Sequence, residues 1–465
     1  MHFLLIKSMK DIDPADFFNE SYLIDYFDNH IRKKKGGGRD NLTPEKFWTR
    51  YENEIKDIAS KCLLGSYKFS FYNEKLVLKG RNKNPRVLSI PSIRDRLVLG
   101  VLNNYLSRVF DDCVNHEVPN ALINRIKSFL DSRKEDVYFL RTDFKNFYGS
   151  INIHFLMDVL SSRISNINIL KVIHSAITTP TLSISERKTN IEENVQGIPQ
   201  GLAISNILAA IYMRSFDKEF GEKVSDLYIR YVDDILFLSL SPVNDLQGII
   251  ENEIKIRNLA LTLEPEKCAK GVVGTDSLDF LGYTIGKKIF IRKKSVTHFM
   301  TRVASLATRC KEEFDNPYKR PRFISKNSEF FEYYIEDFNI LLSGFKCDGH
   351  MYGWLPYFQS ITDVSSLYGM DRVIRLRILR KIPNEICDSV NSLTDTFHAI
   401  HRNSGGSLVR DYDALKTPTE KKHYLAKRGR LDAEKSYSDA QIELIFNNYM
   451  DLIKKKSEQN IGEQS

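Results

Sequence analysis

The sequence predicts an α+β protein built from several structural units, on two observations. Up to about residue 290, short apolar runs with the length of strands, such as 229–240, alternate with segments whose apolar residues recur at helical spacing. From about residue 295 onward the apolar residues recur mostly at helical spacing, and the segment is basic. Because a single core rarely serves 465 residues, we expect roughly two to four units.

The composition allows several cores and leaves the class of partner open. Hydrophobic residues make up 42% of the chain and aromatic residues 11%, which is enough for such cores. The 68 Lys and Arg residues exceed the 60 Asp and Glu residues, which gives a net charge of +8. This surplus is compatible with nucleic acid or another anionic partner, and equally with a solvated surface.

Cysteine usage and the N-terminal segment indicate the cytoplasm. The six cysteines are Cys62, Cys113, Cys268, Cys310, Cys347 and Cys387. They form no CxxC pair and no zinc-like spacing, so we expect free thiols in a reducing compartment. The four-residue apolar run before Lys7 is too short for a signal peptide, and no run of about 18 apolar residues occurs. We therefore expect a cytoplasmic protein that does not enter a membrane.

The N-terminal segment predicts helices and one flexible loop. Residues 1–35 have the pattern of a short strand followed by helical pieces, and the glycines at 36–38 predict a loop after a basic run. A helix should then begin with Thr43 as its N-cap and Pro44 at its first position. Its apolar face would contain Phe47, Tyr51, Ile55 and Ile58.

Strands and helices alternate through the middle of the chain. Residues 66–90 should form strands, and a long helix should follow over about 93–110. The stretch "DVYFLRTDFKNFYGSI" predicts a buried strand, a turn at Gly149 and then a helix. The turn "GIPQG" at 197–201 leads into an apolar helix.

The remaining elements are a hairpin, short strands and helices. The run "IRYVDDILFLSL" at 229–240 predicts two strands joined at the acidic pair, followed by a helix over about 243–260 and a turn at Pro265. Two short strands should lie in "SLDFLGYTIGKKIFIRKK". The stretch "DAQIELIFNNYMDLIKKK" predicts a last helix.

Two adjacent carboxylates, Asp233 and Asp234, stand in the apolar hairpin. Burying them is costly unless a cation neutralises them, although in isolation an Asp-Asp turn that reaches water is the simpler interpretation. Asp143 also ends an apolar strand. Brought together, such acids offer the hard oxygen ligands that magnesium prefers. Two ions about 3.5–4 Å apart support in-line phosphoryl transfer, so the pattern favours nucleotide polymerisation.

Several stretches in order resemble the palm motifs of reverse transcriptases. They are "RTDFKNFYGSI", "GIPQG", "RYVDD", "LTLEPEKC" and "FLGYTI". Upstream, "KKKGGGRDNLTPEKFW" is similar to the extra N-terminal motif of bacterial reverse transcriptases. The stretch "NPRVLSIPSIRDRLVLGVLNNYLSRVF" is similar to their fingers motif. The resemblance covers about residues 32–290 and implies a right-hand polymerase architecture.

The resemblance also implies a division of the chain into four parts. Residues 1–60 would be an N-terminal helical extension with a basic, Gly-rich loop, and residues 61–290 the fingers and palm. Residues 291–400 would form a helical thumb, with the primer grip "FLGYTI" just before it. Residues 401–465 would form a basic helical C-terminal extension.

The implied catalytic residues are acids and one lysine. Asp143 and Asp233 would bind metal, with Asp234 as the neighbouring acid and the Phe144 carbonyl as a further ligand. The expected cofactor is a pair of Mg²⁺ ions, with Mn²⁺ as a substitute. Lys267 matches the lysine that protonates the leaving pyrophosphate, although a lysine near a turn is more often only solvated.

The implied nucleotide-binding residues include an aromatic side chain and a glycine-bounded turn. From the residues alone, either Phe147 or Tyr148 could be the steric gate against a 2′-hydroxyl; the register of the motif favours Tyr148. Gly197 and Gly201 would allow tight backbone geometry, while Gln200 contacts the nucleotide or the template base.

Basic residues of the fingers would bind the triphosphate. Arg86 is the expected clamp, together with Lys83 or Arg81, because guanidinium groups pair bidentately with phosphate oxygens. Arg94 and Arg96 would either hold the template or pair with acids.

Departures from the common pattern indicate the branch. Val232 replaces the usual Ala before the two aspartates, Asn206 stands where a Pro is usual, and Ala210 where an Asn is usual. This form resembles bacterial reverse transcriptases of the uncharacterised and antiphage-defence groups. The resemblance implies an RNA-directed DNA polymerase that copies a partner noncoding RNA into cDNA from dNTPs. It leaves room for a homo-oligomer or a second defence protein.

Two alternatives remain open. One is a retron-type, protein-primed or template-independent DNA polymerase, for which the 22 tyrosines offer hydroxyls without identifying one. The other is a polymerase-like scaffold that binds RNA without catalysis, against which the intact aspartates count. The stretch "HAIH" at 398–401 is interpreted as helix surface and not as a metal site.

Overall fold

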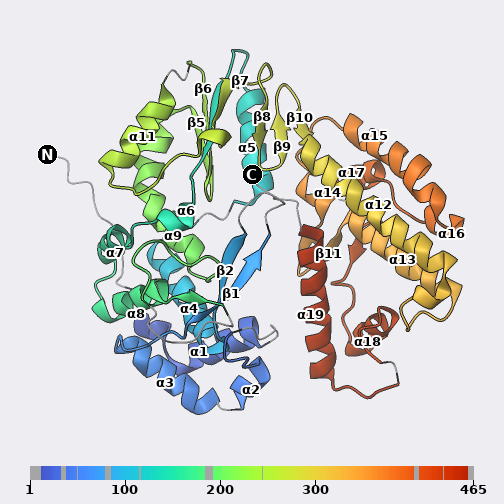
Figure 1. The fold of residues 1–465 in the computed structure, drawn as a ribbon, viewed down its shortest axis with the longest axis horizontal. Coiled ribbons are helices and arrows are strands. Elements are labelled where there is room, and N and C mark those ends of the chain that lie inside the picture. Colours follow the sequence, from blue (N-terminus) through green and yellow to red (C-terminus); the bar gives the residue numbers. More distant parts are fainter. Residues whose placement is uncertain are drawn as a thin grey trace. The chain divides into compact units, whose positions relative to one another are not determined.

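A computed structural model describes residues 12–32, 38–49, 51–78, 85–114, 117–183, 192–242, 245–402, 408–432 and 434–458. The chain divides into two compact units. The first comprises Met1–His116 and Leu140–Cys268, and the second comprises Glu117–Phe139 and Ala269–Ser465. Figure 1 labels most of the helices and strands of both units. The four-part division expected from the resemblance, with boundaries at 60, 290 and 400, stays a prediction.

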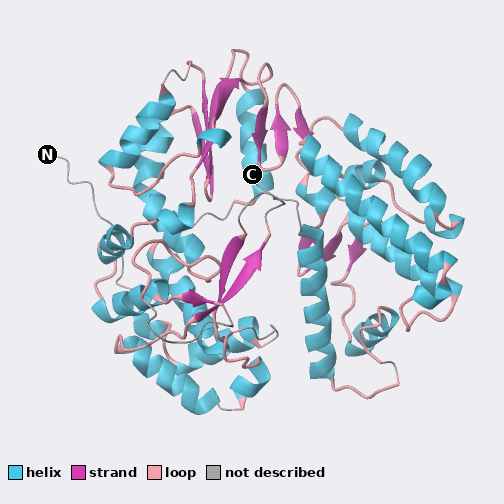
Figure 2. Ribbon diagram, in the orientation of Figure 1, coloured by secondary structure: helices cyan, strands magenta, loops and turns pink. Residues whose placement is uncertain are grey.

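Helices and short strands alternate in the first unit, as the α+β class requires (Figure 2). Its α-helices are α1 (Glu20–Tyr26), α2 (Pro44–Trp48), α3 (Tyr51–Leu63), α4 (Ile93–Val109), α6 (Phe147–Ser150), α7 (Ile153–Ser161), α8 (Ile167–Thr178), α9 (Ser205–Ser215), α10 (Glu222–Val224) and α11 (Leu246–Ile256). Shorter 3₁₀ or π turns are η1 (Pro14–Asp16), η2 (Phe27–Ile31), η3 (Asp111–Cys113), η4 (Phe216–Gly221) and η5 (Pro265–Lys267).

Two sheets organise the first unit. In one, β1 (Tyr72–Val77) pairs antiparallel with β2 (Arg86–Ile90) and parallel with β4 (Thr181–Leu182). In the other, β6 (Asp234–Ser239) lies between β5 (Leu227–Tyr231) and β3 (Tyr138–Asp143). The hairpin predicted at 229–240 is therefore confirmed, with Tyr231 paired to Asp234 across its turn.

The predicted first long helix is interrupted. Thr43 caps α2, with its side chain accepting a hydrogen bond from the Lys46 amide, and Pro44 occupies the first turn as predicted. However, α2 ends at Trp48 and a separate helix begins at Tyr51. At the end of α2 the Thr49 hydroxyl donates to the Lys46 carbonyl at 2.8 Å. The strand expected near the N-terminus and most of the Gly-rich loop lie outside the described residues.

The hairpin strand β6 belongs to the core. Ile235, Leu236, Phe237 and Leu238 are all fully buried, so both faces of the strand are covered. A strand buried on both faces reads as a continuous apolar run, as this one does. Asp234, the first residue of β6, is held by a rigid element and not by a loop.

The turn after β3 differs from the predicted one. The chain reverses at Lys145 and Asn146, and Asn146 adopts a left-handed conformation with φ of 47°. Asparagine tolerates this region better than most residues. Gly149 lies inside the short helix α6, where a Cβ would approach the Asn146 side chain to 2.4 Å. The glycine is therefore needed for close packing and not for the turn itself.

The second unit is mainly helical. Its α-helices are α5 (Pro119–Asp131), α12 (Lys293–Asp315), α13 (Asn327–Ser343), α14 (Trp354–Tyr357), α15 (Ser365–Val373), α16 (Asn384–Cys387), α17 (Leu393–His401), α18 (Pro418–Lys427) and α19 (Asp439–Glu458). Its 3₁₀ or π turns are η6 (Pro317–Lys319), η7 (Ile374–Ile378) and η8 (Leu379–Lys381). "HAIH" falls on α17, as expected.

Short strands accompany these helices. They are β7 (Ala269–Val272), β8 (Leu278–Phe280), β9 (Tyr283–Ile285), β10 (Ile289–Ile291), β11 (Phe345–Cys347), β12 (His350–Tyr352) and β13 (Arg410–Asp411). Three strands, β8 to β10, form where two were predicted. The extra strand arises because the segment turns twice, at Leu281–Gly282 and again near Gly286, and both residues of the first turn have positive φ.

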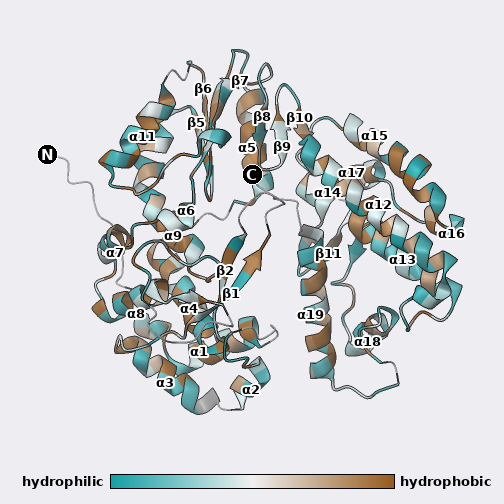
Figure 3. Cartoon of the chain, in the orientation of Figure 1, coloured by the Kyte–Doolittle hydropathy of each residue, from teal (hydrophilic) through white to brown (hydrophobic). Residues whose placement is uncertain are grey.

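The predicted last helix, α19, is confirmed. Figure 3 shows hydrophobic residues recurring along it. Ile442, Phe446, Met450 and Ile453 are buried in a core with α18 and β11. No helix among the described residues combines the length and the apolar character that crossing a membrane requires. All six cysteines are free thiols.

Asp112 connects three segments of the first unit. It follows α4 in η3 and accepts hydrogen bonds from Arg163 at 2.7 and 3.0 Å and from Arg214 in α9 at 2.7 Å. The bonds from Arg163 lower the pKa of the Asp112 carboxyl, although partial burial opposes them. A carboxylate whose pKa is lower in the folded state stabilises the fold at any pH at which it is ionised in both the folded and the unfolded state.

The change Asp112→Asn should lower the free energy of unfolding by about 2–3 kcal/mol at pH 7, because it leaves two arginines without their shared carboxylate. Since the folded-state pKa lies below the unfolded one, this contribution is complete above about pH 5 and is lost as the pH falls below about 4. Urea unfolding at pH 7 and pH 5 should give equal losses. The exposed neighbour Asp111 provides a control, because Asp111→Asn should change stability by less than about 0.5 kcal/mol.

Candidate active site

The three aspartates come together at one end of the β5-β6-β3 strands. Asp143 ends β3, Asp233 lies in the hairpin turn and Asp234 begins β6. The Phe144 amide donates a hydrogen bond to the Asp233 carbonyl at 3.3 Å. Sheet pairing therefore places acids that are 90 positions apart in sequence next to one another, and the Phe144 main chain lies beside them.

Burial and the neighbouring carboxylates disfavour the ionised form of Asp143 and Asp233. Asp143 is only 2% exposed. Burial and then the charge of Asp233 raise the pKa of Asp143 to about 6, against the opposing effect of Lys267. Burial and the charge of Asp234 also raise the pKa of Asp233. Carboxyls arranged in this way would be stabilised in their ionised form by an added cation.

Lys267 supplies one positive charge to the cluster. Its Nζ lies 2.9 Å from Asp143 Oδ2. The turn η5 is anchored to the same strand end, because the Glu264 amide donates to the Asp143 carbonyl at 2.8 Å. The structure thus brings Lys267, 124 positions further along the chain, into direct contact with the first aspartate.

Arg141 supplies a second charge, and sequence reasoning missed it. Its Nη2 lies 2.8 Å from Asp234 Oδ1, and the side chains are 13% and 1% exposed. A signal was available: Arg141 stands two positions before Asp143 in β3, so both side chains point to the same face of the strand. The other Asp234 oxygen, Oδ2, is buried and has no hydrogen-bond partner.

Asp143 and Asp233 fit a site for divalent metal. Their raised pKa values and the buried, partnerless Oδ2 of Asp234 indicate unbalanced negative character that hard cations would neutralise. Asp234 fits as a ligand less well, because Arg141 already occupies one of its oxygens. Metal bound by these carboxylates would polarise phosphate oxygens and activate a hydroxyl.

A second group of possible metal ligands has its ligand atoms closer together. Among the described residues, Cys347, Asp348 and Asp413 are the one trio of His, Cys, Asp or Glu side chains whose ligand atoms all lie within 4.8 Å of one another. The group lies in the second unit and was not predicted. Asp348 is 72% exposed and pairs with Lys454 at 2.6 Å. Backbone amides of residues 348 and 349 already bind the Asp413 carboxylate, so this group has satisfied charges without an ion.

The hairpin turn is held in a strained conformation. Val232 has φ of 59°, which is unfavourable for a β-branched residue. Arg230 donates to the Val232 carbonyl at 2.9 Å and is itself fixed by an ion pair with Asp217 in η4. Asp217 also accepts a hydrogen bond from Tyr228 at 2.6 Å. This network over-determines the turn that positions Asp233.

The structure separates the two candidates for the steric gate. Phe147 is 3% exposed and stacks on Phe144, with ring centroids 5.7 Å apart. Tyr148 is half-buried, and its hydroxyl donates to Asn206 Oδ1 at 2.7 Å. Burial and the nearby charge of Asp233 raise the pKa of Tyr148 to about 12. Tyr148, not Phe147, therefore lies beside the carboxylates.

The "GIPQG" turn joins this region to β2. The Ile198 amide donates to the Tyr148 carbonyl at 2.9 Å, and the Ser89 amide donates to the Gln200 carbonyl at 2.7 Å. Gly197 and Gly201 both have positive φ. A Cβ on Gly197 would approach the backbone of α6 to 2.7 Å, so the turn can pack closely only with glycine there.

The basic residues of the fingers have different positions. Arg86 is exposed at the start of β2, and its charge lowers the pKa values of Asp233 and Tyr148, so it lies near both. Arg94 instead pairs with acids of α3, including Glu54 at 3.2 Å. The guanidinium of Arg96 donates to the backbone carbonyl of residue 91 at 3.2 Å.

Two of the predicted basic residues cannot be placed. Lys83 and Arg81 lie outside the described residues.

Paired strand-end carboxylates, an aromatic residue beside them and a nearby arginine are groups that nucleotidyl transfer can use. Residues 77–285 match the family model described as "Reverse transcriptase (RNA-dependent DNA polymerase)". This match covers a little under half of the chain and contains the three aspartates, Tyr148 and Lys267. The chain therefore carries a reverse transcriptase domain, and its fold class is that of right-hand polymerases. The enzyme class of the domain is RNA-directed DNA polymerase.

Two curated fungal proteins are similar to part of the chain. The chain is 25% identical over 207 residues to a 91 kDa protein in the cob intron of Schizosaccharomyces pombe, covering 43% of this chain and 24% of that protein. It is 24% identical over 231 residues to the COX1/OXI3 intron 2 protein of Saccharomyces cerevisiae, covering 47% and 25%. The chain thus spans about a quarter of the length of these relatives.

Solved telomerase structures show weaker likeness. Telomerase from Candida albicans, in complex with a fragment of telomeric RNA, has a TM-score of 0.43 and 13% identity, covering 73% of this chain and 67% of that one. Truncated apo telomerase from Candida tropicalis has a TM-score of 0.36 and 20% identity, covering 53% and 59%. These scores are too low to support conclusions about this chain.

The change Arg141→Gln should lower the free energy of unfolding by about 3–5 kcal/mol at pH 8, because it leaves the Asp234 carboxylate buried without a cation. Denaturant unfolding of the variant and the wild type at pH 8 would measure the loss.

Adding Asp234→Asn to the Arg141 variant should recover much of the lost stability, because it removes the unpaired charge. Arg108→Gln, an exposed change on α4, serves as the control and should cost less than about 0.5 kcal/mol. If the single and double variants were equally unstable at pH 8, the ion pair would not be what stabilises Asp234.

Proposed function

We propose that this chain is a reverse transcriptase that synthesises cDNA by metal-dependent nucleotidyl transfer. The observation that carries the proposal is the pairing of the buried Asp143 with the half-buried Asp233, brought together by sheet pairing inside the matched domain. Their burial and mutual repulsion favour bound divalent cations, and Mg²⁺ is the expected ion, with Mn²⁺ as a substitute.

Each neighbouring residue then has a role in the reaction. Asp143, Asp233 and the Phe144 carbonyl would hold two metal ions. These ions would stabilise the leaving pyrophosphate and activate the attacking 3′-hydroxyl. Arg86 would bind the triphosphate, with Lys83 as its expected partner. Lys267, held beside Asp143, can donate a proton to the leaving group.

Two further assignments concern Asp234 and the nucleotide pocket. We assign Asp234 as a positioning acid that fixes the head of β6 through Arg141, in addition to its expected place in the catalytic cluster. Tyr148 would lie under the incoming sugar, oriented by Asn206. Gln200 and Gly201 would contact the base from the turn that is bonded to β2.

Purified protein supplied with Mg²⁺, dNTPs and its co-purifying RNA should incorporate labelled nucleotide. Asp143→Asn or Asp233→Asn should reduce incorporation by more than about 100-fold, since even changes behind the ligands of a metal site cost about 10–100-fold. The control is Glu266→Gln, which removes an exposed acid next to Lys267 and should leave the rate unchanged. Equal incorporation by the Asp233 variant and the wild type would refute the assignment.

The change Tyr148→Ala should relax the choice of sugar. We expect the preference for dNTPs over rNTPs to fall at least about tenfold, because the aromatic ring no longer occupies the space of the 2′-hydroxyl. Asn206→Ala keeps the ring but removes its hydrogen-bond acceptor and should have a smaller effect. Single-nucleotide extension with each substrate measures the ratio. Unchanged selectivity in the Tyr148 variant would mean that another residue is the gate.

The template and the biological role are finer proposals. We infer a noncoding RNA template and a role in bacterial antiphage defence from the resemblance of the motifs around Val232 and Asn206. The two fungal relatives are named for introns and do not support a defence role. Sequencing the nucleic acids that co-purify with the protein would identify template and product. Phage plating on cells with and without the Asp233 variant would test the role.

Two alternatives have distinguishable outcomes. Mass spectrometry that finds DNA covalently attached to the protein would support protein priming, as in the retron-type or template-independent alternative. Undiminished protection of cells by a variant lacking Asp143, Asp233 and Asp234 would support a non-catalytic RNA-binding scaffold. The buried, destabilising charges of Asp143 and Asp234 argue against a scaffold, because a binding protein has no need of them.

A further inference from the structure

The second unit contains a cavity that the polymerase site does not use. It measures about 400 Å³ and is lined by residues of α12, α13, α14 and α19 and by the segment that follows α18. Pockets for small ligands in proteins are typically about 300–1,000 Å³. All of its lining residues lie beyond residue 285, where the match to the reverse transcriptase family ends.

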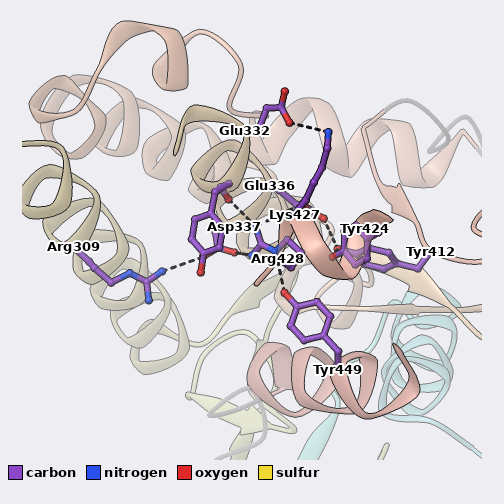
Figure 4. Close-up of polar contacts among 10 residues, drawn as sticks. Arg309, Glu332, Glu336, Asp337, Tyr412, Tyr424, Lys427, Arg428 and Tyr449 are labelled. Atoms are coloured by element: carbon purple, nitrogen blue, oxygen red, sulfur yellow. Dashed lines mark hydrogen bonds and ion pairs between the residues drawn. The ribbon is translucent and has the colours of Figure 1, made fainter. Parts of the chain in front are cut away.

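Positive charge dominates the lining. The charged lining residues are Arg302, Arg309, Arg428, Arg430, Lys456 and Asp337. Five cations thus face one carboxylate. Figure 4 shows the polar contacts that this carboxylate, Asp337, makes with neighbouring side chains.

The single carboxylate is committed to two arginines. Asp337 accepts from Arg309 at 3.0 Å and also pairs with Arg428. Arg428 is 6% exposed; it donates to the Tyr333 carbonyl and to the Tyr449 hydroxyl, each at 3.0 Å (Figure 4). These groups satisfy one another and hold the end of α18 against α13 and α19. Asp337 therefore neutralises Arg309 and Arg428 in the wall of the cavity, and the other cations of the lining have no part in this network.

Arg430 and Lys456 are the cations that the packing does not require. Both are exposed, and no carboxylate among the described residues lies within ion-pair distance of either one. Arg430 lies over the Tyr449 ring, 4.7 Å from its centroid. A guanidinium held on an aromatic face keeps its hydrogen-bond donors free at the edge, in the arrangement that suits a phosphate.

Apart from Ser305 and Ser457, the rest of the lining is apolar or aromatic. Ile340, Leu341 and Ile453 line the cavity together with Tyr333. Apolar walls with a few converging polar groups are typical of ligand sites, and flat apolar surfaces suit a planar ring. The lining therefore offers a place for a heterocycle next to a place for a phosphate.

We propose that this cavity binds a nucleoside phosphate, with the base against the apolar wall and the phosphate on Arg430 and Lys456. The ligand is either a free nucleotide or the terminal phosphorylated nucleotide of a nucleic acid chain, because both present the same groups. The site is separate from the carboxylate cluster and does not depend on the proposed polymerase activity.

Trp354 provides a local reporter. It lines the cavity, is 3% exposed and stacks on Phe299 with centroids 4.0 Å apart. The chain has two tryptophans, so Trp48→Phe leaves Trp354 as the sole indole. This full-length variant would be titrated with AMP in buffer containing EDTA, which removes divalent ions from the aspartate cluster. We expect a saturable change in Trp354 fluorescence, with matching heat in calorimetry.

Binding should depend on the phosphate and on the two exposed cations. Adenosine, without the phosphate, should bind at least about tenfold more weakly than AMP, as should AMP to the double variant Arg430→Gln with Lys456→Gln. The matched control is Arg322→Gln with Lys455→Gln, two exposed cations of the same unit that do not line the cavity. The control should bind AMP like the parent.

The remaining arms identify the source of the ligand. Tighter binding of a 5′-phosphorylated dinucleotide than of AMP, lost without its phosphate, would assign the cavity to a chain end; the reverse order would assign it to a free nucleotide. Three results would overturn the proposal: no binding of AMP or of the dinucleotide, equal binding of adenosine and AMP, or equal weakening in the double variant and its control. None of them depends on whether the protein polymerises DNA.

Discussion

The structure of the first unit depends on keeping buried carboxylates charged and in place. Asp143 and Asp234 are almost completely buried, and each is held by one cation: Lys267 for the first and Arg141 for the second. Asp233, between them in the turn, makes no such ion pair among the described residues and has a raised pKa. The cluster therefore lacks positive charge at Asp233, and a metal ion bound there would be stabilising.

Strands and not loops position this cluster. Asp143 ends β3, Asp234 begins β6, and β6 is buried on both faces. The strained Val232 turn is fixed from β5 by Arg230, which is fixed in turn by Asp217. Rigid elements hold ligands more accurately than loops do, which suits chemistry that needs ions at a fixed separation. The strain at the turn is accommodated by the surrounding hydrogen bonds.

The second unit uses charge in a different way. There, Asp337 gathers two arginines into a satisfied network that joins α13 to the end of α18, and the surplus cations lie on the edge of a cavity. In the aspartate cluster the acids exceed what their cations neutralise; in the cavity lining the cations exceed the acids. The first arrangement suits divalent metal and the second suits phosphate.

The sequence by itself predicted the polymerase residues and determined most of the elements. An apolar run interrupted by two acids located the hairpin, a long helical stretch located α4, and capping chemistry located Thr43, because these features depend on neighbours in the chain. The register of the motif already favoured Tyr148 over Phe147, but only the tertiary structure showed that Phe147 is buried and that Tyr148 lies near Asp233. It likewise revealed the Arg141–Asp234 pair, the contact of Lys267 with Asp143 and the cationic cavity. Each of these joins residues that are distant in sequence, and no local pattern specifies which of many possible partners packing will select.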